Sequence, residues 1–342
     1  MTAVDVVDNE GIRGIRAPSC LLCSREGRLL FDRLRDPIFG VPGAWGMRAC
    51  GRCRFFWLDP RPLRDEIPKL YQQYHTHTPE SGAMGVLGSW RSGTRDALLR
   101  ALFGYRDLPR RPVHLLVAGL LACIGPVRDW AGGNVMWVPG TARGRLLDVG
   151  CGAGRFLADM KALGWQVAGV EFDPRAVETA RTHFGLEVRT GSVHDAGFPA
   201  GSFDAVTLSH VIEHLPDPVE TLSKCRDLLK PGGTLVMATP NPESLCRRAF
   251  GREWRGWEIP RHLFVYSTAA LRTIAERSGL RVQSVFTTAK AAAWHWHAVR
   301  GGEGGKLLRL ARKAEAVLFG LFGSNLARVG PLGEEVVLIA RR

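Results

Sequence analysis

From residue 144 onward, short apolar runs alternate with stretches that repeat apolar residues at helical spacing. The first run is 146–149, and after three glycines an amphipathic stretch continues to Leu163. This order of buried strand, tight turn and helix start recurs along the rest of the chain. Strands that alternate with helices form parallel sheets, because a parallel connection needs a long crossover. The pattern therefore predicts an α/β domain over 144–342.

Capping residues mark the helices of this domain. Asp173 and Asp217 each precede a proline, which is favoured at the first helical position, and Ser267 begins a helix that Gly279 closes. The strands expected between and after these helices are 145–149, 167–172, 187–190, 203–209, 234–239, 281–286 and 334–340.

Three further segments are expected to be helical but do not belong to this alternation. A helix is expected from Trp90 to Tyr105, and after it 113–127 is apolar with arginines on both sides. This run is shorter than the ~20 residues that span a bilayer, so we expect a buried or interfacial helix. A basic amphipathic helix is expected over 306–322. It either lies on an anionic membrane or packs as a lid beside 113–127.

Four of the eight cysteines form two C-x-x-C pairs near the N-terminus. Two such pairs suit a tetrahedral zinc ion, whereas a pair of redox thiols is the alternative. The hairpin between them would use the apolar residues at 29–30 and 38–39. We therefore expect a zinc-ribbon lobe over 18–60, a helical linker or cap region over 61–143, and a lid segment over 241–266 in the main domain. The expected ligands of this structural Zn²⁺ are Cys20, Cys23, Cys50 and Cys53.

Composition narrows the setting of the protein. The net charge of +13 suits an anionic partner such as a nucleotide-bearing substrate, a nucleic acid or an anionic membrane, although it also serves solubility. The first residues have no apolar core of a signal peptide, so we expect a cytoplasmic protein. The basic amphipathic helix expected at 306–322 adds peripheral contact with the inner face of the membrane. A nucleic-acid partner is disfavoured, because no aromatic and basic stacking motif is present.

The turn after the first strand carries the most specific pattern. Gly150, Gly152 and Gly154 stand at alternate positions. Glycines let the backbone approach a ligand closely, and the following helix N-terminus offers unpaired N–H groups. A dinucleotide site would place its third glycine one residue later, where Arg155 stands. Glu171, on the second strand, stands where such folds hold a ribose.

With Asp148 before its glycines, this stretch resembles the class I S-adenosylmethionine-dependent methyltransferases. The segments 203–206 and 229–233 also resemble that family. The resemblance implies a Rossmann-like α/β fold with a seven-stranded sheet whose last strand is antiparallel. It implies S-adenosyl-L-methionine as the cofactor, whereas a glycine turn without a ligand is the alternative. The residues expected at the cofactor are Asp148, Gly150, Cys151, Gly152, Gly154, Glu171, Phe172, Ser192, Val193 and Ser209.

Histidines gather after the fourth and fifth strands, beyond whose carboxyl ends ligands lie in open parallel sheets. The chain resembles zinc-binding sugar C-methyltransferases in its four cysteines and a tyrosine-rich segment, and there the histidine that matches His262 acts as base. It also resembles ubiquinone-type O-methyltransferases and small-RNA methyltransferases, which place an E-x-x-E-H motif after strand four, in some members around a divalent metal. Structural hydrogen bonding is the alternative for each histidine. The candidate catalytic residues are His262, His214, Glu213, His210 and Tyr74, and a second divalent metal is considered at His210, Glu213, His214 and His262.

These patterns predict an S-adenosylmethionine-dependent methyltransferase for a small-molecule or glycan acceptor. The favoured acceptor is a nucleotide- or lipid-linked sugar. O-methylation of a quinone-like or other small hydroxylated molecule is the alternative, and RNA is a weaker one. A zinc-ribbon interaction protein with a vestigial cofactor domain is the non-enzymatic hypothesis, which the intact glycine turn disfavours.

Overall fold

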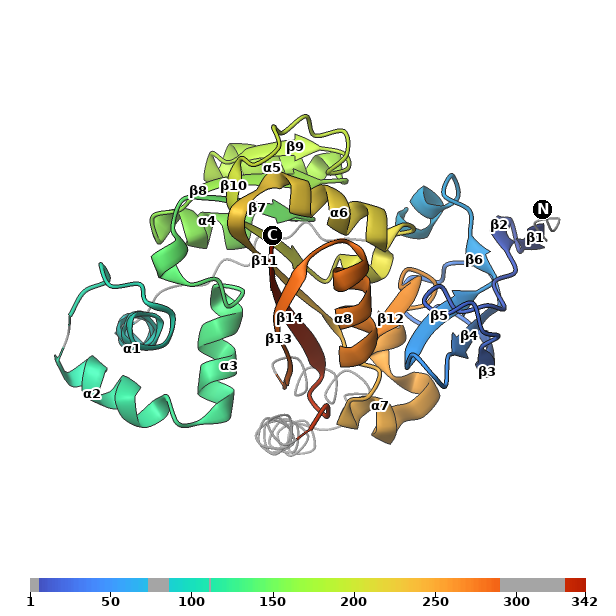
Figure 1. The fold of residues 1–342 in the computed structure, drawn as a ribbon, viewed down its shortest axis with the longest axis horizontal. Helices are drawn as coiled ribbons and strands as arrows, with labels where there is room; N and C mark the ends of the chain where they lie inside the picture. The colour runs from blue at the N-terminus through green and yellow to red at the C-terminus, as the bar shows by residue number, and fades with distance from the viewer. Residues whose placement is uncertain (1–5, 73–85, 111, 290–329) are drawn as a thin grey trace.

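The computed structural model describes residues 6–72, 86–110, 112–289 and 330–342. Three parts follow one another across the molecule: an N-terminal lobe, a central sheet with its helices, and a helical arm formed by α1 to α3 (Figure 1). The expected helix at 306–322 and the candidate Tyr74 lie outside the described residues.

A seven-stranded mixed sheet forms the centre, in the order β13-β14-β11-β10-β7-β8-β9. β14 runs antiparallel to β11 and to β13, and the other neighbours are parallel. This confirms the expected α/β fold with one antiparallel strand. β11 is longer than expected, since it already begins at Leu229. The strands are β7 (Arg145–Val149), β8 (Gln166–Glu171), β9 (Glu187–Thr190), β10 (Phe203–Ser209), β11 (Leu229–Pro240), β13 (Arg281–Thr288) and β14 (Glu335–Arg341).

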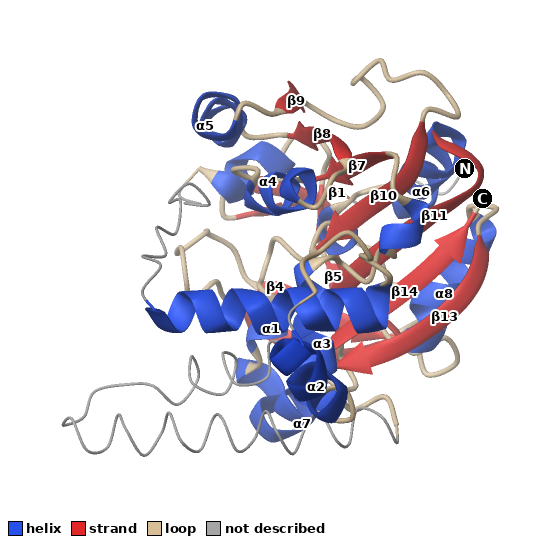
Figure 2. Cartoon of the chain, turned by 90° about the vertical axis from the view of Figure 1, so that its left-hand side faces the viewer, coloured by secondary structure: helices blue, strands red, loops and turns tan. Residues whose placement is uncertain are grey.

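Local sequence explains where the helices of this domain begin. The side chain of Asp173 accepts a hydrogen bond from the Arg175 N–H at 2.8 Å, and Ser267 accepts one from the Ala270 N–H at 3.2 Å. Both are N-caps, which leave fewer backbone donors unpaired. Figure 2 shows the helices beside the sheet strands, with the arrows of β13 and β14 in opposite directions. The helices are α4 (Arg155–Ala162), α5 (Pro174–Phe184), α6 (Pro218–Leu228), α7 (Leu245–Phe250) and α8 (Thr268–Arg277).

The N-terminal lobe shares a sheet with the main domain. β12 (Phe264–Tyr266), which belongs to the later part of the chain, pairs antiparallel with β5 (Phe55–Asp59). β5 continues to β4 (Trp45–Ala49) and β3 (Arg28–Leu34), and a small sheet of β1 (Val6–Asn9), β2 (Ile12–Ile15) and β6 (Arg61–Pro62) completes the lobe. The residues expected at 38–39 in the hairpin lie in a turn instead, because the second strand of the hairpin begins only at Trp45.

One hydrophobic core runs through the lobe and the sheet. At the shared strands, Phe55 stacks on Trp57 at 5.8 Å between ring centroids and on Phe264 at 5.5 Å. All three rings are fully buried. Burying a large apolar side chain contributes roughly 1.5–3 kcal/mol, so these contacts hold the lobe firmly to the domain.

The helical arm corrects one expectation. The apolar run 113–127 is not one helix but two: α2 (Pro112–Leu121) and α3 (Gly125–Asn134), which meet at 117°. Ile124 is extended, with φ −88° and ψ 117°, and Pro126 stands in the first turn of α3, where a proline has no N–H to continue the hydrogen bonding of α2. The expected helix at 90–105 is α1 (Val86–Phe103). No single described helix is long and apolar enough to cross a membrane, whereas the bent pair α2 and α3 together has the length and composition.

Candidate functional site

The glycine turn between β7 and α4 has the backbone that only glycine adopts easily. Gly150, Gly152 and Gly154 have φ values of +73°, +52° and +84°. A Cβ at Gly150 would meet Val211 at 2.4 Å and one at Gly154 would meet Ala180 at 2.8 Å, so both are closely packed. At Gly152 nothing lies within 4 Å of the added Cβ. This open space is where backbone meets ligand in such turns.

Two carboxylates flank the turn. Glu171, at the end of β8, accepts hydrogen bonds from the backbone N–H groups of Gly152 at 2.8 Å and of Asp173 at 3.0 Å. Asp148 is buried in β7 and accepts a hydrogen bond from the Thr207 hydroxyl at 2.6 Å. Burial raises the pKa of Asp148 to about 7, and the nearby Glu171 charge adds to the rise. A cationic ligand group beside Asp148 would reverse this shift.

The remaining cofactor candidates lie around the same edge of the sheet. Phe172 follows Glu171 and is 64% exposed, so its ring is available to a planar ligand. The Ser192 hydroxyl is not free, because it donates to Asp195 Oδ2 at 2.6 Å. Cys151 and Val193 are buried, and Ser209 ends β10 half-buried. The structure thus brings the ten cofactor candidates to the carboxyl edge of β7 to β10.

His214 and His262 face each other beyond the carboxyl end of β10. Their ring centroids are 4.6 Å apart. His262 Nδ1 lies 2.8 Å from the carbonyl of Gly256, and His214 Nδ1 lies 3.1 Å from the carbonyl of Arg261. A carbonyl only accepts, so a neutral His262 carries its proton on Nδ1 and its lone pair on Nε2, whereas His214 Nδ1 also lies 3.0 Å from the Tyr71 hydroxyl. Burial and the nearby His262 lower the pKa of His214 to about 4, which keeps its ring neutral.

Glu213 completes this cluster. Its Oε2 accepts from the Thr239 hydroxyl at 2.9 Å, while its Oε1 is buried and makes no hydrogen bond within the described chain. Burial would raise the pKa of Glu213, but His210 outweighs it and lowers the pKa to about 2. Ligand atoms of Glu213, His214 and His262 lie within 4.8 Å of one another. An anionic oxygen and two imidazoles at this spacing fit a divalent metal ion.

His210 is not part of the group formed by Glu213, His214 and His262, whose ligand atoms lie close enough to hold one metal ion. It has φ = +53° and lies outside the short helix η3 (Ile212–His214), so it is not one helical turn below His214 as the sequence suggested. Its Nε2 lies 2.9 Å from Glu335 Oε1 and its Nδ1 lies 3.4 Å from Glu213 Oε1. Burial would lower the pKa of His210, but these two carboxylates raise it to about 10.

Sequence reasoning missed Glu258 and Glu335 near the cluster, and it placed Tyr71 only within the tyrosine-rich segment. Tyr71, at the end of η1 (Ile67–Tyr71), brings its hydroxyl to 3.0 Å from His214 Nδ1. Glu258 Oε2 lies 3.7 Å from His262 Nε2. Glu335 opens β14 and is the second residue of the strand expected at 334–340, and an acid at the start of an apolar strand was the available signal. Glu258 stands four residues before His262. An acid at that spacing is common in sequences, so it gave no signal of a contact.

A buried ion pair connects the cluster to the N-terminal lobe. Arg261 Nη1 donates to Asp36 Oδ2 at 2.8 Å, and neither side chain is exposed. Arg261 also pairs with Glu258 at 3.1 Å. Burial would raise the pKa of Asp36, but the hydrogen bond from Arg261 outweighs it and lowers the pKa. Because Arg261 precedes His262 and its carbonyl contacts His214, the lobe helps to fix both histidines.

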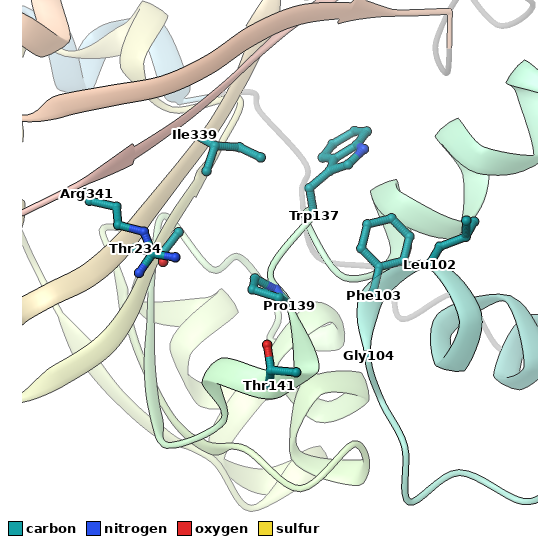
Figure 3. A pocket seen from close by; sticks show the side chains of 9 residues that line it. All are labelled: Leu102, Phe103, Gly104, Trp137, Pro139, Thr141, Thr234, Ile339 and Arg341. Carbon is teal, nitrogen blue, oxygen red and sulfur yellow. The ribbon is translucent and has the colours of Figure 1, made fainter.

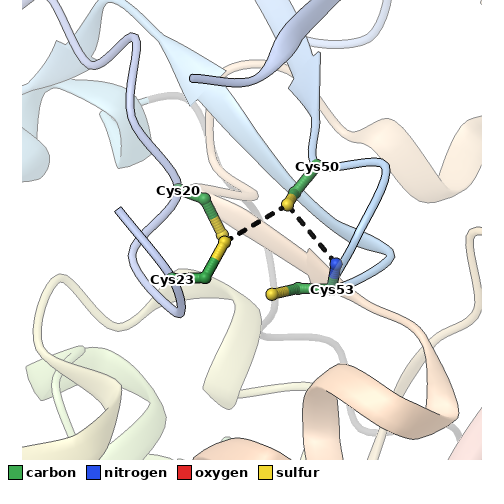
Figure 4. Close-up of side chains that lie close together, drawn as sticks. All are labelled: Cys20, Cys23, Cys50 and Cys53. Atoms are coloured by element: carbon green, nitrogen blue, oxygen red, sulfur yellow. Dashed lines mark hydrogen bonds between the residues drawn. The ribbon is translucent and has the colours of Figure 1, made fainter. Parts of the chain in front are cut away.

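The four N-terminal cysteines converge from two matching turns (Figure 4). Each turn is closed by a backbone bond to the first cysteine of its pair, Ser24 N–H to Cys20 at 2.8 Å and Arg54 N–H to Cys50 at 2.9 Å. The Sγ atoms of Cys23 and Cys50 are 3.6 Å apart, close to the ~3.8 Å between thiolates in a tetrahedral zinc site and far from a disulfide bond. The ligand atoms of Cys20, Cys23, Cys50 and Cys53 all lie within 4.8 Å of one another.

A pocket of about 390 Å³ lies elsewhere, between the helical arm and the sheet (Figure 3). None of the candidate site residues lines it, so it does not belong to the site described above. Its lining residues are Leu102, Phe103, Gly104, Trp137, Pro139, Thr141, Thr234, Ile339 and Arg341.

Known proteins resemble this chain over its central and later parts. A family model described as a methyltransferase domain matches residues 131–285. A ubiquinone biosynthesis O-methyltransferase of Xanthomonas campestris pv. campestris is 38% identical over 164 residues, which are 45% of this chain and 64% of that protein. The protein of the same name from Xanthomonas axonopodis pv. citri is 35% identical over 191 residues, which are 52% of this chain and 75% of that protein.

Solved structures resemble the chain more distantly. A SAM-dependent methyltransferase from Archaeoglobus fulgidus has a TM-score of 0.43 and 22% identity, and the match covers 64% of this chain and 92% of that one. The chain spans 64% of the length of the Xanthomonas campestris relative, just under two thirds.

Proposed function

The chain belongs to the class I S-adenosylmethionine-dependent methyltransferases, and on that premise we propose that it transfers the methyl group to a hydroxyl oxygen of a small-molecule acceptor. The observation that carries the proposal is the pair of facing imidazole rings of His214 and His262, 4.6 Å apart between centroids, beyond the carboxyl end of β10. The relatives named as ubiquinone biosynthesis O-methyltransferases support oxygen as the atom that receives the methyl group.

The glycine turn and the two carboxylates are the proposed cofactor site. The open space at Gly152 would receive the amino-acid end, and Asp148 would face its positive charge. Glu171 would receive the ribose hydroxyls, and its present bonds to two backbone N–H groups hold its carboxylate in place. Phe172, with its exposed ring, would contact the adenine. When bound, the cofactor supplies an electrophilic methyl group on its sulfonium.

The histidine cluster is the proposed catalytic site. Methyl transfer from a sulfonium is an in-line displacement, so the protein must align the acceptor and take up its proton. His262 Nε2 would receive that proton, because its Nδ1 is held by the Gly256 carbonyl. His214 is the second candidate base, and the Tyr71 hydroxyl would position its ring. Tyr74 remains a proposed catalytic residue.

A divalent metal ion is a second arrangement that the same residues fit. Glu213, His214 and His262 would hold it, and it would lower the pKa of a bound acceptor hydroxyl. His262 cannot then serve as base. Treatment with a chelator separates the two arrangements: activity that is lost and then restored by Mg²⁺ or Mn²⁺ assigns the cluster to the metal, and unchanged activity assigns it to proton transfer.

A sugar acceptor, nucleotide-linked or lipid-linked, is the second candidate. Two features favour it: the four-cysteine lobe, and Tyr71, whose hydroxyl reaches His214. We propose that the four cysteines bind one structural zinc ion. A methyl-donor assay against hydroxylated aromatic compounds, nucleotide sugars and lipid-linked glycans tests both candidates. Methylation of hydroxylated aromatics alone would support the first, and methylation of the sugars would replace it with the second.

A further inference from the structure

The helical arm presents an apolar face that packs against nothing in the described chain. Val113, Leu116 and Leu120 on α2 are 61%, 69% and 70% exposed. They recur at intervals of three and four residues and so lie along one side of the helix. No charged residue occurs between Pro112 and Leu121. The opposite side of α2 is ordinary core, since Ala118 is fully buried in a cluster with Leu98 of α1.

Exposed apolar residues also occur in the bend and in α3. Ile124 and Trp130 are 44% and 43% exposed. Of the nine large apolar side chains that are exposed in the described chain, five lie on α2, α3 and the bend between them. We call this surface the elbow; its residues are Val113, Leu116, Leu120, Ile124 and Trp130. Such a concentration marks an interaction surface, because single exposed apolar residues are usually scattered.

Arginines lie at both borders of the elbow, with Asp107 and Asp129 as the acidic residues among them. Arg106 and Arg110 are exposed just before α2, and Arg128 is exposed on α3. The nearby Asp107 is paired with Arg143. An apolar helix face with arginines at its borders and a tryptophan at its rim is the pattern of a segment that lies in a membrane interface. Arginine and lysine near an anionic bilayer each contribute about 1 kcal/mol of attraction.

We propose that the elbow docks the protein on an anionic lipid bilayer. Leu116 and Leu120 enter the boundary between head groups and acyl chains, and Arg110 and Arg128 contact the anionic head groups. α2 has ten residues and is about 15 Å long, so it lies along the surface. Figure 1 shows α2 at the end of the arm that points away from the sheet. The proposal goes beyond the methyl-transfer reaction and does not depend on the acceptor.

Co-sedimentation with vesicles tests the proposal. The full chain is mixed with vesicles of phosphatidylcholine alone or with added phosphatidylglycerol, at low and at high salt. We expect binding only to the anionic vesicles, weakened by salt. L116D with L120D should lower the partition coefficient at least tenfold, and R110Q with R128Q about fivefold per residue. The matched control is L29D on β3, where Leu29 is 46% exposed and distant from the arm.

Two further readouts locate the contact. Hydrogen exchange should slow in peptides that cover 112–130 when anionic vesicles are added. Sedimentation velocity without lipid should give the same species for the full chain and for L116D with L120D. Absence of binding to anionic vesicles at low salt would overturn the proposal. So would equal binding by L116D with L120D, or a dimer that this double variant dissociates, which would assign the elbow to a second copy of the chain.

Discussion

At the scale of single residues, Gly152 gives the sharpest test of the cofactor site. We expect Gly152→Leu to abolish S-adenosylmethionine binding, because the new side chain fills the open space at the turn. Left-handed backbone costs a non-glycine residue only about 1–2 kcal/mol, so the fold should persist. Gly185→Leu is the matched control: Gly185 ends α5 with φ = +58° and also has nothing within 4 Å of an added Cβ. Calorimetry should show binding to the control alone.

The two histidines separate binding from chemistry. We expect His262→Gln to lower kcat by about 10²–10⁴-fold and to leave the affinity for the cofactor unchanged, because His262 lies beyond the glycine turn. His214→Gln should lower kcat less if His262 is the base. His183→Gln, an exposed histidine in the last turn of α5, is the control and should keep full activity. Full activity in both site variants would place the base elsewhere.

Site residues within a recognisable motif could be predicted, whereas contacts that only the strand pairing creates were missed. The glycine turn, Asp148 and Glu171 are specified by a local strand–turn–helix pattern. Glu335 reaches His210 across 125 positions of sequence, through the pairing of β14 with β11. Only the tertiary structure makes that contact. For the same reason the left-handed backbone of His210, which turns its ring toward Glu335, had no signal in the local pattern.

At the scale of elements, the ion pair between Asp36 and Arg261 should stabilise the contact between the lobe and the site. We expect Asp36→Ala to lower the free energy of unfolding by about 3 kcal/mol, because the buried guanidinium of Arg261 then keeps only its ion pair with Glu258. Asp32→Ala, at an exposed aspartate on the same hairpin, should change it by less than about 0.5 kcal/mol. Urea denaturation measures both. A small effect of Asp36→Ala would contradict the role of this pair.

The same pair predicts a pH dependence. Arg261 holds the pKa of Asp36 below its ordinary value, so the unfolded state takes up a proton more readily. The stabilisation is complete above the unfolded pKa and is lost as the pH falls through the folded pKa. The difference in unfolding free energy between the wild type and Asp36→Ala should therefore be constant near neutral pH and should shrink in acid. A difference that grew in acid would contradict the sign of this shift.

Elements were predicted well where caps and periodicity agree, as in α5 and α8. The break in 113–127 was missed although Gly125 and Pro126 marked it, because the apolar residues continue through it without a polar interruption. The pairing of β12 with β5 could not be predicted from the sequence. The two strands lie more than 200 residues apart, and a three-residue strand carries no periodicity of its own.

At the scale of the whole molecule, the lobe and the domain should respond together to metal loss. We expect about one equivalent of zinc, lost in Cys50→Ala, with a lower melting temperature and lower turnover. Turnover should fall more than cofactor affinity, because the lobe contacts the histidine cluster and not the glycine turn. Cys123→Ala, at an exposed cysteine outside the cluster, should retain the metal. A metal-free protein with full stability would contradict the zinc site.

The central claim is that this protein moves a methyl group from S-adenosylmethionine to an oxygen atom, with the proton taken up or the hydroxyl held at His214 and His262. Its most direct test is the structure of the product formed with a ¹³C-labelled methyl donor. The account predicts a labelled methyl whose carbon shift is that of a methyl ether, formed by the wild type and not by His262→Gln. A labelled methyl bonded to carbon or nitrogen, or equal product from His262→Gln, would contradict it.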